Sequence, residues 1–298
     1  MTEDCQQARA QHGGYLNPVG EYRAVHRHTI TTGCPGTDDY RILRYAVALP
    51  RTLRRPWLVV NLHGMVTRPA YQPPIYGRFT SSAQLGAIIV FVSDPILEMH
   101  PEARIGWFLQ AEYLADDLVR VVHDLIVEHR LDGIVWNGWS AGGYAAVRFA
   151  SRTCDLAPTM AFSYAPQNSP EHLTWWANYY ASLSSSAQFD PYCELAAATG
   201  SPRKLPRDLS SLLHEESDYY NRFAVSIRVN NRDMTHLAHH LRPIIKSAPQ
   251  ARNLDWAVLN NGLGHGEESN DTFWKEFRDA TDKWTSGNYS PALARSAV

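Results

Sequence analysis

Several short segments of this chain are apolar along their whole length and rich in β-branched residues, without the alternation of a strand that has one face in water. Strands of this kind belong to a parallel sheet that is covered by helices on both faces. This feature excludes most all-β and all-α folds. The segments are Trp57–Leu62, Ala87–Val92, Gly133–Asn137 and Thr159–Tyr164.

Helical patterns lie between these segments. Apolar residues recur at three- and four-residue spacing over Ala111–His129, and a second helix is predicted from Ala141. The same alternation returns later as a strand, a helix, a strand and a final helix at Ala224–Val229, Thr235–Ser247, Leu254–Leu259 and Thr272–Trp284. Two β-rich runs near the start, Ala24–Thr32 and Arg41–Leu49, flank the turn residues 33–39 and predict a hairpin. The pattern predicts an α/β fold.

The alternation also predicts the domain organisation. One core domain is expected over residues 21–165 and 221–285, with an insertion at 166–220 that has no strand pattern of its own and would cap one end of the sheet. Residues 1–20 are expected to be an N-terminal arm and residues 286–298 a C-terminal tail.

Charge and hydropathy exclude two classes of function. Lysine and arginine total 28 against 30 aspartates and glutamates, a net charge of −2 that does not favour nucleic-acid binding. No run approaches the roughly 20 apolar residues of a membrane span, and the first residues do not resemble a secretory signal, so a cytoplasmic protein is expected. The cysteines are far apart and are expected to be free thiols in a reducing compartment: Cys5, Cys34, Cys154 and Cys193.

One motif carries the chemistry. Gly138-Trp139-Ser140-Ala141-Gly142 places Gly-x-Ser-x-Gly across a predicted strand end and helix start. In such a turn the serine backbone is strained, and the glycines let strand and helix pass close to each other. The hydroxyl of Ser140 is thereby raised above the sheet, and the amide of Ala141 faces the same space.

A serine hydroxyl needs a base, and the base needs an orienting acid. His265 follows the last predicted strand on a glycine-rich loop, and Asp233 follows the strand before it. The chain order serine, acid, histidine is the one expected when the nucleophile lies on a strand-to-helix turn. Asp155 and Asp190 are alternative acids, less favoured because the first precedes a strand and the second lies in the insertion.

With these pieces the sequence resembles the α/β-hydrolase superfamily over about residues 24–284, helped by Leu62-His63-Gly64 after an early strand. The resemblance implies a mostly parallel sheet of about eight strands, helices on both faces, and no cofactor or metal. It further implies an oxyanion hole formed by the backbone amides of Met65 and Ala141. Within the superfamily, Ser-Ala-Gly-Gly after a helix bearing Asp116 and Asp117 is similar to feruloyl-esterase and polyhydroxyalkanoate-depolymerase relatives.

Other chemically capable residues have simpler interpretations. His236, His239 and His240 fall at helical spacing, and we interpret them as a solvated helix face in preference to a metal site. His63, beside the expected oxyanion turn, either forms a structural hydrogen bond or contacts substrate. Trp139 is a candidate substrate contact. The cluster Trp175, Trp176, Tyr179 and Tyr180 either lines an acyl pocket or packs the insertion onto the core.

The sequence therefore predicts a serine hydrolase that cleaves an ester, thioester or amide of a small-molecule or carrier-bound acyl substrate through an acyl-enzyme. An alternative uses the same residues but passes the acyl group to an alcohol or amine, as an acyltransferase or cyclase. A second alternative is a ligand-binding protein with an idle site. No sequence feature indicates the oligomeric state.

Overall fold

The computed structural model divides the chain into two compact units, which we call unit 1 (residues 1–133 and 174–205) and unit 2 (residues 134–173 and 206–298). The residues that it describes are 9–15, 22–34, 40–67, 72–100, 102–169, 179, 208–214, 222–249, 251, 253–266 and 268–287.

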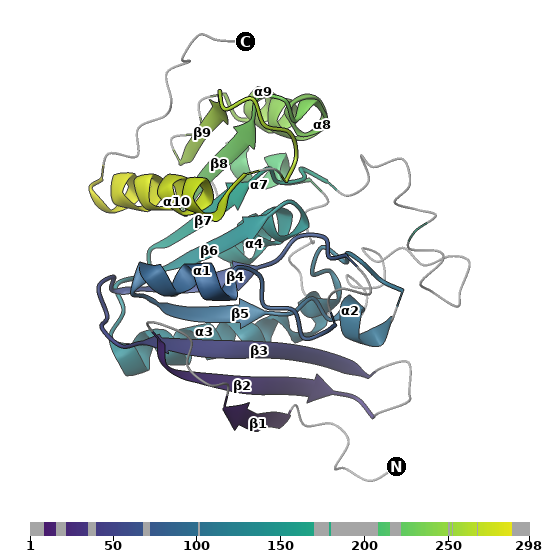
Figure 1. Ribbon diagram of the computed structural model, residues 1–298, viewed down its shortest axis with the longest axis vertical. Coiled ribbons are helices and arrows are strands. Elements are labelled where there is room, and N and C mark those ends of the chain that lie inside the picture. Colours follow the sequence, from purple (N-terminus) through teal and green to yellow (C-terminus); the bar gives the residue numbers. More distant parts are fainter. Residues whose placement is uncertain are drawn as a thin grey trace. The chain divides into compact units, whose positions relative to one another are not determined.

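The strands of unit 1 have the order β1-β2-β3-β5-β4 (Figure 1). The pairs β1–β2, β2–β3 and β3–β5 are antiparallel, and β4–β5 is parallel. The predicted hairpin is therefore confirmed as β2–β3. The strand bounds are β1 (Arg9–Tyr15), β2 (Tyr22–Thr32), β3 (Arg41–Pro50), β4 (Trp57–Leu62) and β5 (Ile88–Val92).

Strand β1 corrects the expectation that residues 1–20 are an arm throughout. Residues 9–15 read Arg-Ala-Gln-His-Gly-Gly-Tyr, without the apolar alternation that signals a strand. Their backbone nevertheless pairs with β2. Main-chain hydrogen bonds to an open sheet edge are sufficient to form such a strand, and side-chain patterns do not reveal it.

The helices of unit 1 include one long amphipathic element. Helix α3 (Ala115–His129) buries Leu118 and Val122 and packs against β4. It ends where Arg130 takes a left-handed conformation (φ 51°). The predicted helix over Ala111–His129 is confirmed, except that its first turn is the 3-10 segment η3 (Gln110–Leu114). The shorter elements are α1 (Phe79–Ser82), η2 (Ala83–Leu85) and α2 (Ile96–Met99).

The strands of unit 2 are all parallel, in the order β6-β7-β8-β9. Side chains on β6, β7 and β8 are buried almost without exception, which explains their uninterrupted apolar runs. The strand bounds are β6 (Gly133–Trp139), β7 (Thr159–Tyr164), β8 (Ala224–Asn230) and β9 (Leu254–Leu259).

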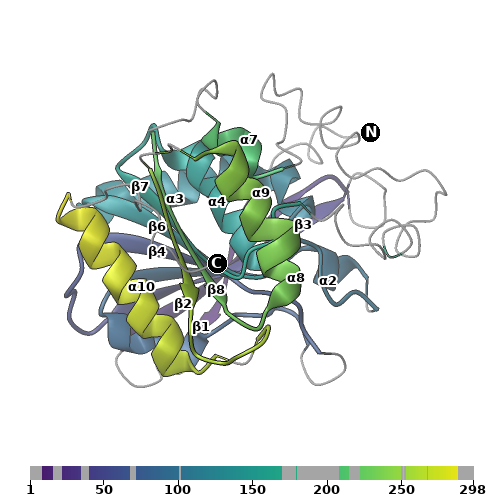
Figure 2. The same cartoon turned by 90° about the horizontal axis from the view of Figure 1, so that it is seen from above.

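Helices cover both faces of these strands. Figure 2 shows α10 on one face and α4, α8 and α9 on the other. The predicted helix Thr235–Ser247 contains a π-helical turn, η5, between α8 and α9. The helix bounds are α4 (Ala141–Thr153), α7 (Ser210–Leu213), α8 (Met234–His236), η5 (Leu237–Leu241), α9 (Arg242–Ser247) and α10 (Asn270–Thr285). The α/β class predicted from the alternation is confirmed.

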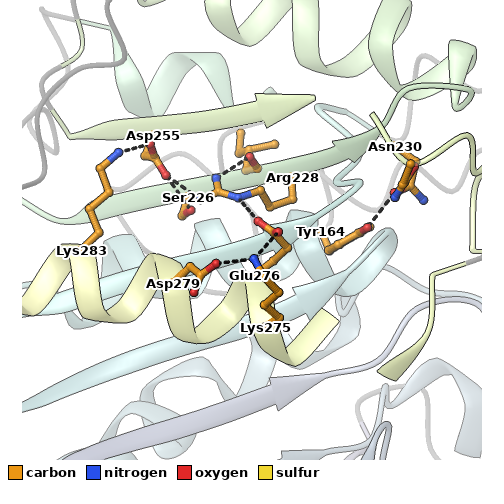
Figure 3. Close-up of polar contacts among 11 residues, drawn as sticks. Tyr164, Ser226, Arg228, Asn230, Asp255, Lys275, Glu276, Asp279 and Lys283 are labelled. Carbon is orange, nitrogen blue, oxygen red and sulfur yellow. Dashed lines mark hydrogen bonds and ion pairs between the residues drawn. The ribbon is translucent and has the colours of Figure 1, made fainter. Parts of the chain in front are cut away.

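A buried ion network ties α10 to the strands beneath it. Arg228 on β8 donates to Asp255 on β9 at 2.8 Å and to Glu276 on α10 at 3.1 Å (Figure 3). Lys283 of α10 donates to the other oxygen of Asp255. Burial opposes ionisation of Asp255, but the two cations hold its pKa below its usual value. Removing one partner of such a network would leave a buried charge uncompensated.

Two expectations about compartment have different outcomes. In the described part of the chain, no helix is long and apolar enough to cross a membrane. Cys154 keeps its thiol, as expected, whereas Cys34 forms a disulfide, so the expectation of free thiols is wrong for Cys34. Most of the expected cap, 166–220, lies outside the described residues, so the division into core and cap stays a prediction.

Candidate active site

The turn between β6 and α4 holds Ser140 in a strained conformation. Its backbone angles, φ 54° and ψ −117°, lie in a region that residues with a side chain rarely adopt. Two hydrogen bonds fix the turn: the Ser140 amide donates to the Tyr164 carbonyl (2.9 Å), and the Tyr144 amide donates to the Ser140 carbonyl (3.1 Å). Strain of this kind persists only where the surrounding structure imposes it, and it clusters at functional sites.

Gly138, the first glycine of the motif, and Gly143, the residue directly after the motif, are required by close packing. A Cβ atom on Gly138 would lie 2.0 Å from the carbonyl oxygen of Gly142, and one on Gly143 would lie 2.5 Å from Ser163 Oγ. The strand end and the first turn of the helix therefore pass at a distance that only glycine permits, which is the reason given for the motif from sequence.

The serine hydroxyl is not used to cap its own helix. Ser140 occupies the N-cap position of α4, yet its side chain makes no capping hydrogen bond, and the residue is 3% exposed. Ala141 is the first helical residue, so its amide has no partner within the helix. The partial positive charge of the helix N-terminus favours a negative charge beside this amide.

Asp233 and His265 are brought together in unit 2. Asp233 follows β8 and caps α8, and its Oδ2 accepts a hydrogen bond from His265 Nδ1 at 2.7 Å. The Asp233 side chain is 3% exposed and that of His265 is 35% exposed. Because an ionised carboxylate only accepts, the proton of neutral His265 lies on Nδ1 and its Nε2 keeps a lone pair.

A second imidazole binds the same carboxylate. His236 Nδ1 lies 2.9 Å from Asp233 Oδ1, and the His236 backbone amide donates to the same oxygen at 3.3 Å. The rings of His236 and His265 are parallel within 2° at a centroid distance of 4.1 Å. His236 and His240 are 5% and 1% exposed. The interpretation of this helix as a solvated face is therefore wrong for both, and holds for exposed His239.

The loop that carries His265 is held by amide side chains at the ends of β8 and β9. Asn230 donates to the carbonyl of Gly264 (2.8 Å), and its Oδ1 accepts from Tyr164 Oη (2.7 Å, Figure 3) and from Asn261 Nδ2 (2.7 Å). The Arg232 amide also donates to the Leu263 carbonyl. Sequence reasoning missed Asn230, although asparagines that follow two neighbouring parallel strands were a usable signal.

Trp139, the residue before Ser140, contacts His265 directly. Its indole stacks on the imidazole with ring centroids 5.3 Å apart and planes inclined by 18°. A Cβ on Gly266 would approach the indole to 3.0 Å, so the tryptophan fits closely against the histidine loop. The candidate substrate contact thus lies against the candidate base.

Burial and hydrogen bonding act in opposite directions on the pKa values of this cluster. Burial opposes ionisation of Asp233, but the hydrogen bonds and charges of His236 and His265 hold its pKa well below the usual range. Burial lowers the pKa of His236, against the opposing effect of its bond to Asp233. The carboxylate is therefore ionised at neutral pH and His236 is neutral, with its proton on Nδ1.

In unit 1, His63 has both ring nitrogens engaged. Its Nδ1 donates to the Gly64 carbonyl (2.8 Å), and its Nε2 accepts from the Asp94 amide (3.0 Å). Burial lowers the pKa of His63 to about 4. These contacts support the interpretation of His63 as a structural hydrogen-bonding residue. Met65 is 50% exposed and directly precedes Val66, whose amide donates to the Arg104 carbonyl.

The remaining candidates are placed as follows. Asp155 pairs with Arg222, away from the Asp233–His265 bond. Tyr179 packs in unit 1: its hydroxyl accepts from the amides of Arg104 and Ile105, and its ring meets Trp107 edge-on. Asp190, Trp175, Trp176 and Tyr180 lie outside the described residues.

The donor set Asp233, His236 and His265 also has metal-binding chemistry, since one ligand atom from each lies within 4.8 Å of the others. Both Nδ1 atoms are already at hydrogen-bond distance from the carboxylate, however. Two imidazole N–H groups, of His236 and His265, thus donate to the one carboxylate of Asp233. These hydrogen bonds leave no gap for an ion between the carboxylate and either imidazole.

Comparison with known proteins supplies the fold. No family model matches this chain, and no curated protein matches it. Among solved structures it is similar to an S-formylglutathione hydrolase from Agrobacterium tumefaciens (15% identity, 92% of this chain and 98% of that chain, TM-score 0.54). It is also similar to an arylesterase (16% identity, 92% of this chain and 87% of that chain, TM-score 0.52). A third similar structure is the capsule O-acetyltransferase of Neisseria meningitidis serogroup A (12% identity, 85% of this chain and 94% of that chain, TM-score 0.51).

The chain thus has the α/β-hydrolase fold, as the resemblance implied. Identities this low carry no activity from neighbour to chain, because one fold supports many functions. The residues with candidate chemistry lie at the turn after β6 and at the ends of β8 and β9.

Proposed function

We propose that this protein is a serine hydrolase that cleaves a carboxylic ester, thioester or amide through an acyl-enzyme. The observation that carries the proposal is the Asp233–His265 hydrogen bond of 2.7 Å in the same unit as a serine on a strained strand-to-helix turn. Trp139 supports it, because the residue next to Ser140 stacks on His265.

In the proposed mechanism, His265 Nε2 takes the proton of Ser140 as its oxygen attacks the substrate carbonyl carbon. The carbonyl oxygen becomes an oxyanion, and the Ala141 amide and, by the resemblance, the Met65 amide are the proposed donors to it; each such donor is worth about 3 kcal/mol. His265 then protonates the leaving group, and water attacks the acyl-enzyme by the same steps. Asp233 keeps the proton on Nδ1 and stabilises the imidazolium.

The test is covalent labelling. A fluorophosphonate probe should label the wild type, and the Ser140→Ala variant should lose the label and about three orders of magnitude or more of kcat on an activated acyl ester. Ser247→Ala is the matched control: it removes a hydroxyl in the same unit that donates to the Ile244 carbonyl of its own helix. Undiminished labelling of Ser140→Ala would overturn the proposal.

A second candidate is acyl transfer to an alcohol or amine by the same residues. The structural likeness to a capsule O-acetyltransferase favours carrying it forward. Product analysis with a competing alcohol or amine separates the two: hydrolysis alone at a saturating acceptor concentration would eliminate transfer. A ligand-binding protein with an idle site, the third candidate, predicts no turnover above Ser140→Ala.

The substrate and the location follow as weaker proposals. A small-molecule or carrier-bound acyl substrate remains proposed, with the cap segment 166–220 selecting the acyl group. A cytoplasmic location stays a prediction, and the disulfide at Cys34 argues against it because such bonds persist mainly in oxidising compartments.

A further inference from the structure

The side chain that the proposed mechanism leaves unused is His236. It lies one helical turn after Asp233, it is 5% exposed, and its Nδ1 is 2.9 Å from the Asp233 oxygen that His265 does not use. A buried histidine is costly to hold in place unless its polar atoms are used. Here Nδ1 is used, and among the described residues Nε2 has no hydrogen-bond partner.

The two hydrogen bonds together set the orientation of the carboxylate. With one oxygen on His265 Nδ1 and the other on His236 Nδ1 and the His236 amide, Asp233 cannot rotate about its terminal torsion without breaking a bond. Pre-orientation of a triad group matters because catalytic groups must be held to within about 0.5 Å of their productive positions.

The parallel rings add a second constraint. The His236 ring lies flat against the His265 ring, with a centroid distance of 4.1 Å and an interplanar angle of 2°. Trp139 also stacks on His265. The imidazole is therefore fixed in tilt as well as in hydrogen-bond direction. A cationic His236 at this distance would repel the imidazolium that forms on His265, so the arrangement requires His236 to be neutral.

From this geometry we propose that His236 is a positioning residue, which acts on His265 through Asp233 and through the stacked ring. The inference rests on the proposed function for its catalytic meaning, but the hydrogen-bonded arrangement can be tested without catalysis. The titratable groups involved are Asp233 and His236 at the start of α8, His265 on its loop, and His240 on η5. The ring centroids of His240 and His236 are 4.9 Å apart. Trp139 on β6 is uncharged.

Two substitutions separate the donor from the ring. His236→Asn keeps an N–H at the place of Nδ1 but removes the ring, and His236→Phe keeps a ring but removes the donor. A hydrogen bond to a charged acceptor is strong enough for its loss to lower kcat about 10- to 100-fold in His236→Phe. KM should stay within about threefold, and His236→Asn should recover most of kcat.

The pH profile reports a positioning role that a merely structural role would not. Without the His236 donor, Asp233 holds the proton of His265 more strongly, so the acid limb of kcat/KM should move to higher pH in His236→Phe. His236→Asn should return it toward the wild type. His239→Phe, an exposed neighbour on η5, is the matched control and should change neither kcat nor the profile.

Proton NMR of the protein tests the arrangement directly. Wild type should show two downfield histidine Nδ1–H resonances, one from each imidazole on Asp233. Asp233→Asn should shift both, Ser140→Ala should keep both, and His236→Asn should keep only that of His265. If His236→Phe does not fold, the resonances of the wild type and of His236→Asn still test whether both imidazoles donate to Asp233.

The inference is overturned by a single downfield resonance in wild type, or by a folded His236→Phe with the kcat and pH profile of wild type. If both resonances are present but Ser140 is not labelled, the proposed function fails and the geometric inference stands. If Ser140 is labelled and His236→Phe is unchanged, only the inference fails.

Discussion

Each unit of this protein contains a buried aspartate that lies next to a histidine at the end of a parallel strand, and the two pairs are bonded in opposite ways. In unit 1, His63 has both ring nitrogens in hydrogen bonds with the main chain. In unit 2, His265 bonds through Nδ1 alone to the residues that the structure describes, and its side chain is 35% exposed. A histidine can act as a base only if one nitrogen is left for the substrate, so the same residue types give structure in one unit and candidate chemistry in the other.

The carboxylates of Asp94 and Asp233 also differ in their hydrogen-bond donors and in the direction of their pKa shifts. Asp94 accepts from the amides of Ile96, Phe108 and Gly106, and burial raises its pKa to about 6. Asp233 accepts from two imidazoles, which hold its pKa well below the usual range. Backbone amides organise the loop after α2 around Asp94, whereas Asp233 keeps a full charge beside the candidate base.

The sharpest test of this contrast replaces each carboxylate by its amide. Asp233→Asn should lower kcat about 10⁴-fold, because it favours the tautomer of His265 that cannot accept the serine proton. Steady-state kinetics on an activated ester measures this loss.

Asp94→Asn is the matched control for that experiment. It should lose stability and keep kcat within about threefold, because the Asp94 side chain accepts hydrogen bonds from amides of its own loop in unit 1. Equal losses of kcat in the two variants would mean that the division between structural and catalytic carboxylate is wrong.

The pH dependence of stability should show the same contrast. Asp94 keeps its proton in the folded state up to about pH 6, so the folded state binds more protons than the unfolded state between about pH 4 and 6. The free energy of unfolding therefore falls with rising pH through this window by about 3 kcal/mol from this residue. The destabilisation caused by Asp94→Asn should accordingly be largest near pH 4 and smaller near pH 7, as measured by urea unfolding.

His63 contributes with the opposite sign. Its folded-state pKa of about 4 lies below that of an unfolded histidine, so the folded state binds fewer protons and stability rises between about pH 4 and 6.5. The wild-type curve should be flatter in this range than that of Asp94→Asn, where the falling contribution of Asp94 no longer offsets the rising contribution of His63. A destabilisation by Asp94→Asn that does not change with pH would contradict the assignment.

A smaller effect is expected at His63 itself. His63→Phe leaves the buried amide of Asp94 without its acceptor, which should cost about 1–3 kcal/mol of unfolding free energy. His63→Gln, whose side-chain oxygen can take the place of Nε2, should lose less. Chemical denaturation compares the two, and equal losses would show that the hydrogen bond does not matter.

The smallest effect is expected at the ring stacked on His265. Trp139→Phe keeps an aromatic face, whereas Trp139→Leu loses it, and aromatic pairs are worth about 0.5–1.5 kcal/mol. We therefore expect kcat/KM to fall about 2- to 10-fold in Trp139→Leu and less in Trp139→Phe. A larger loss in the phenylalanine variant would mean that the indole does more than support the imidazole.

Most of the fold could be predicted from sequence, because strands buried on both faces and helices with one apolar stripe leave periodic patterns. The strand β4 and the helix α4 begin where their patterns begin. Strand β1 could not be predicted, since its residues lack the apolar alternation that marks a strand in sequence. The π-helical turn η5 was also missed, because the periodicity of Thr235–Ser247 resembles that of an ordinary helix.

The candidate site divides in the same way. Ser140 is a sequence candidate because the turn imposes glycines at fixed spacing, and Asp233 and His265 are candidates from their positions after predicted strands. His236 was misassigned, although the spacing of three residues from Asp233 places both side chains on one side of the first helical turn. Burial decides between a solvated and a bonded histidine, and sequence spacing does not report burial.

By itself the sequence determined the α/β alternation, the strained serine turn and the order of the three candidate groups, because each depends on local backbone geometry or on burial periodicity. The tertiary structure alone decided which hydrogen-bond partners each histidine has. Those partners include residues that are distant in the chain, Asp94 for His63 and Asp233 for His265, and only the folded packing of strands brings them within about 3 Å of a ring nitrogen.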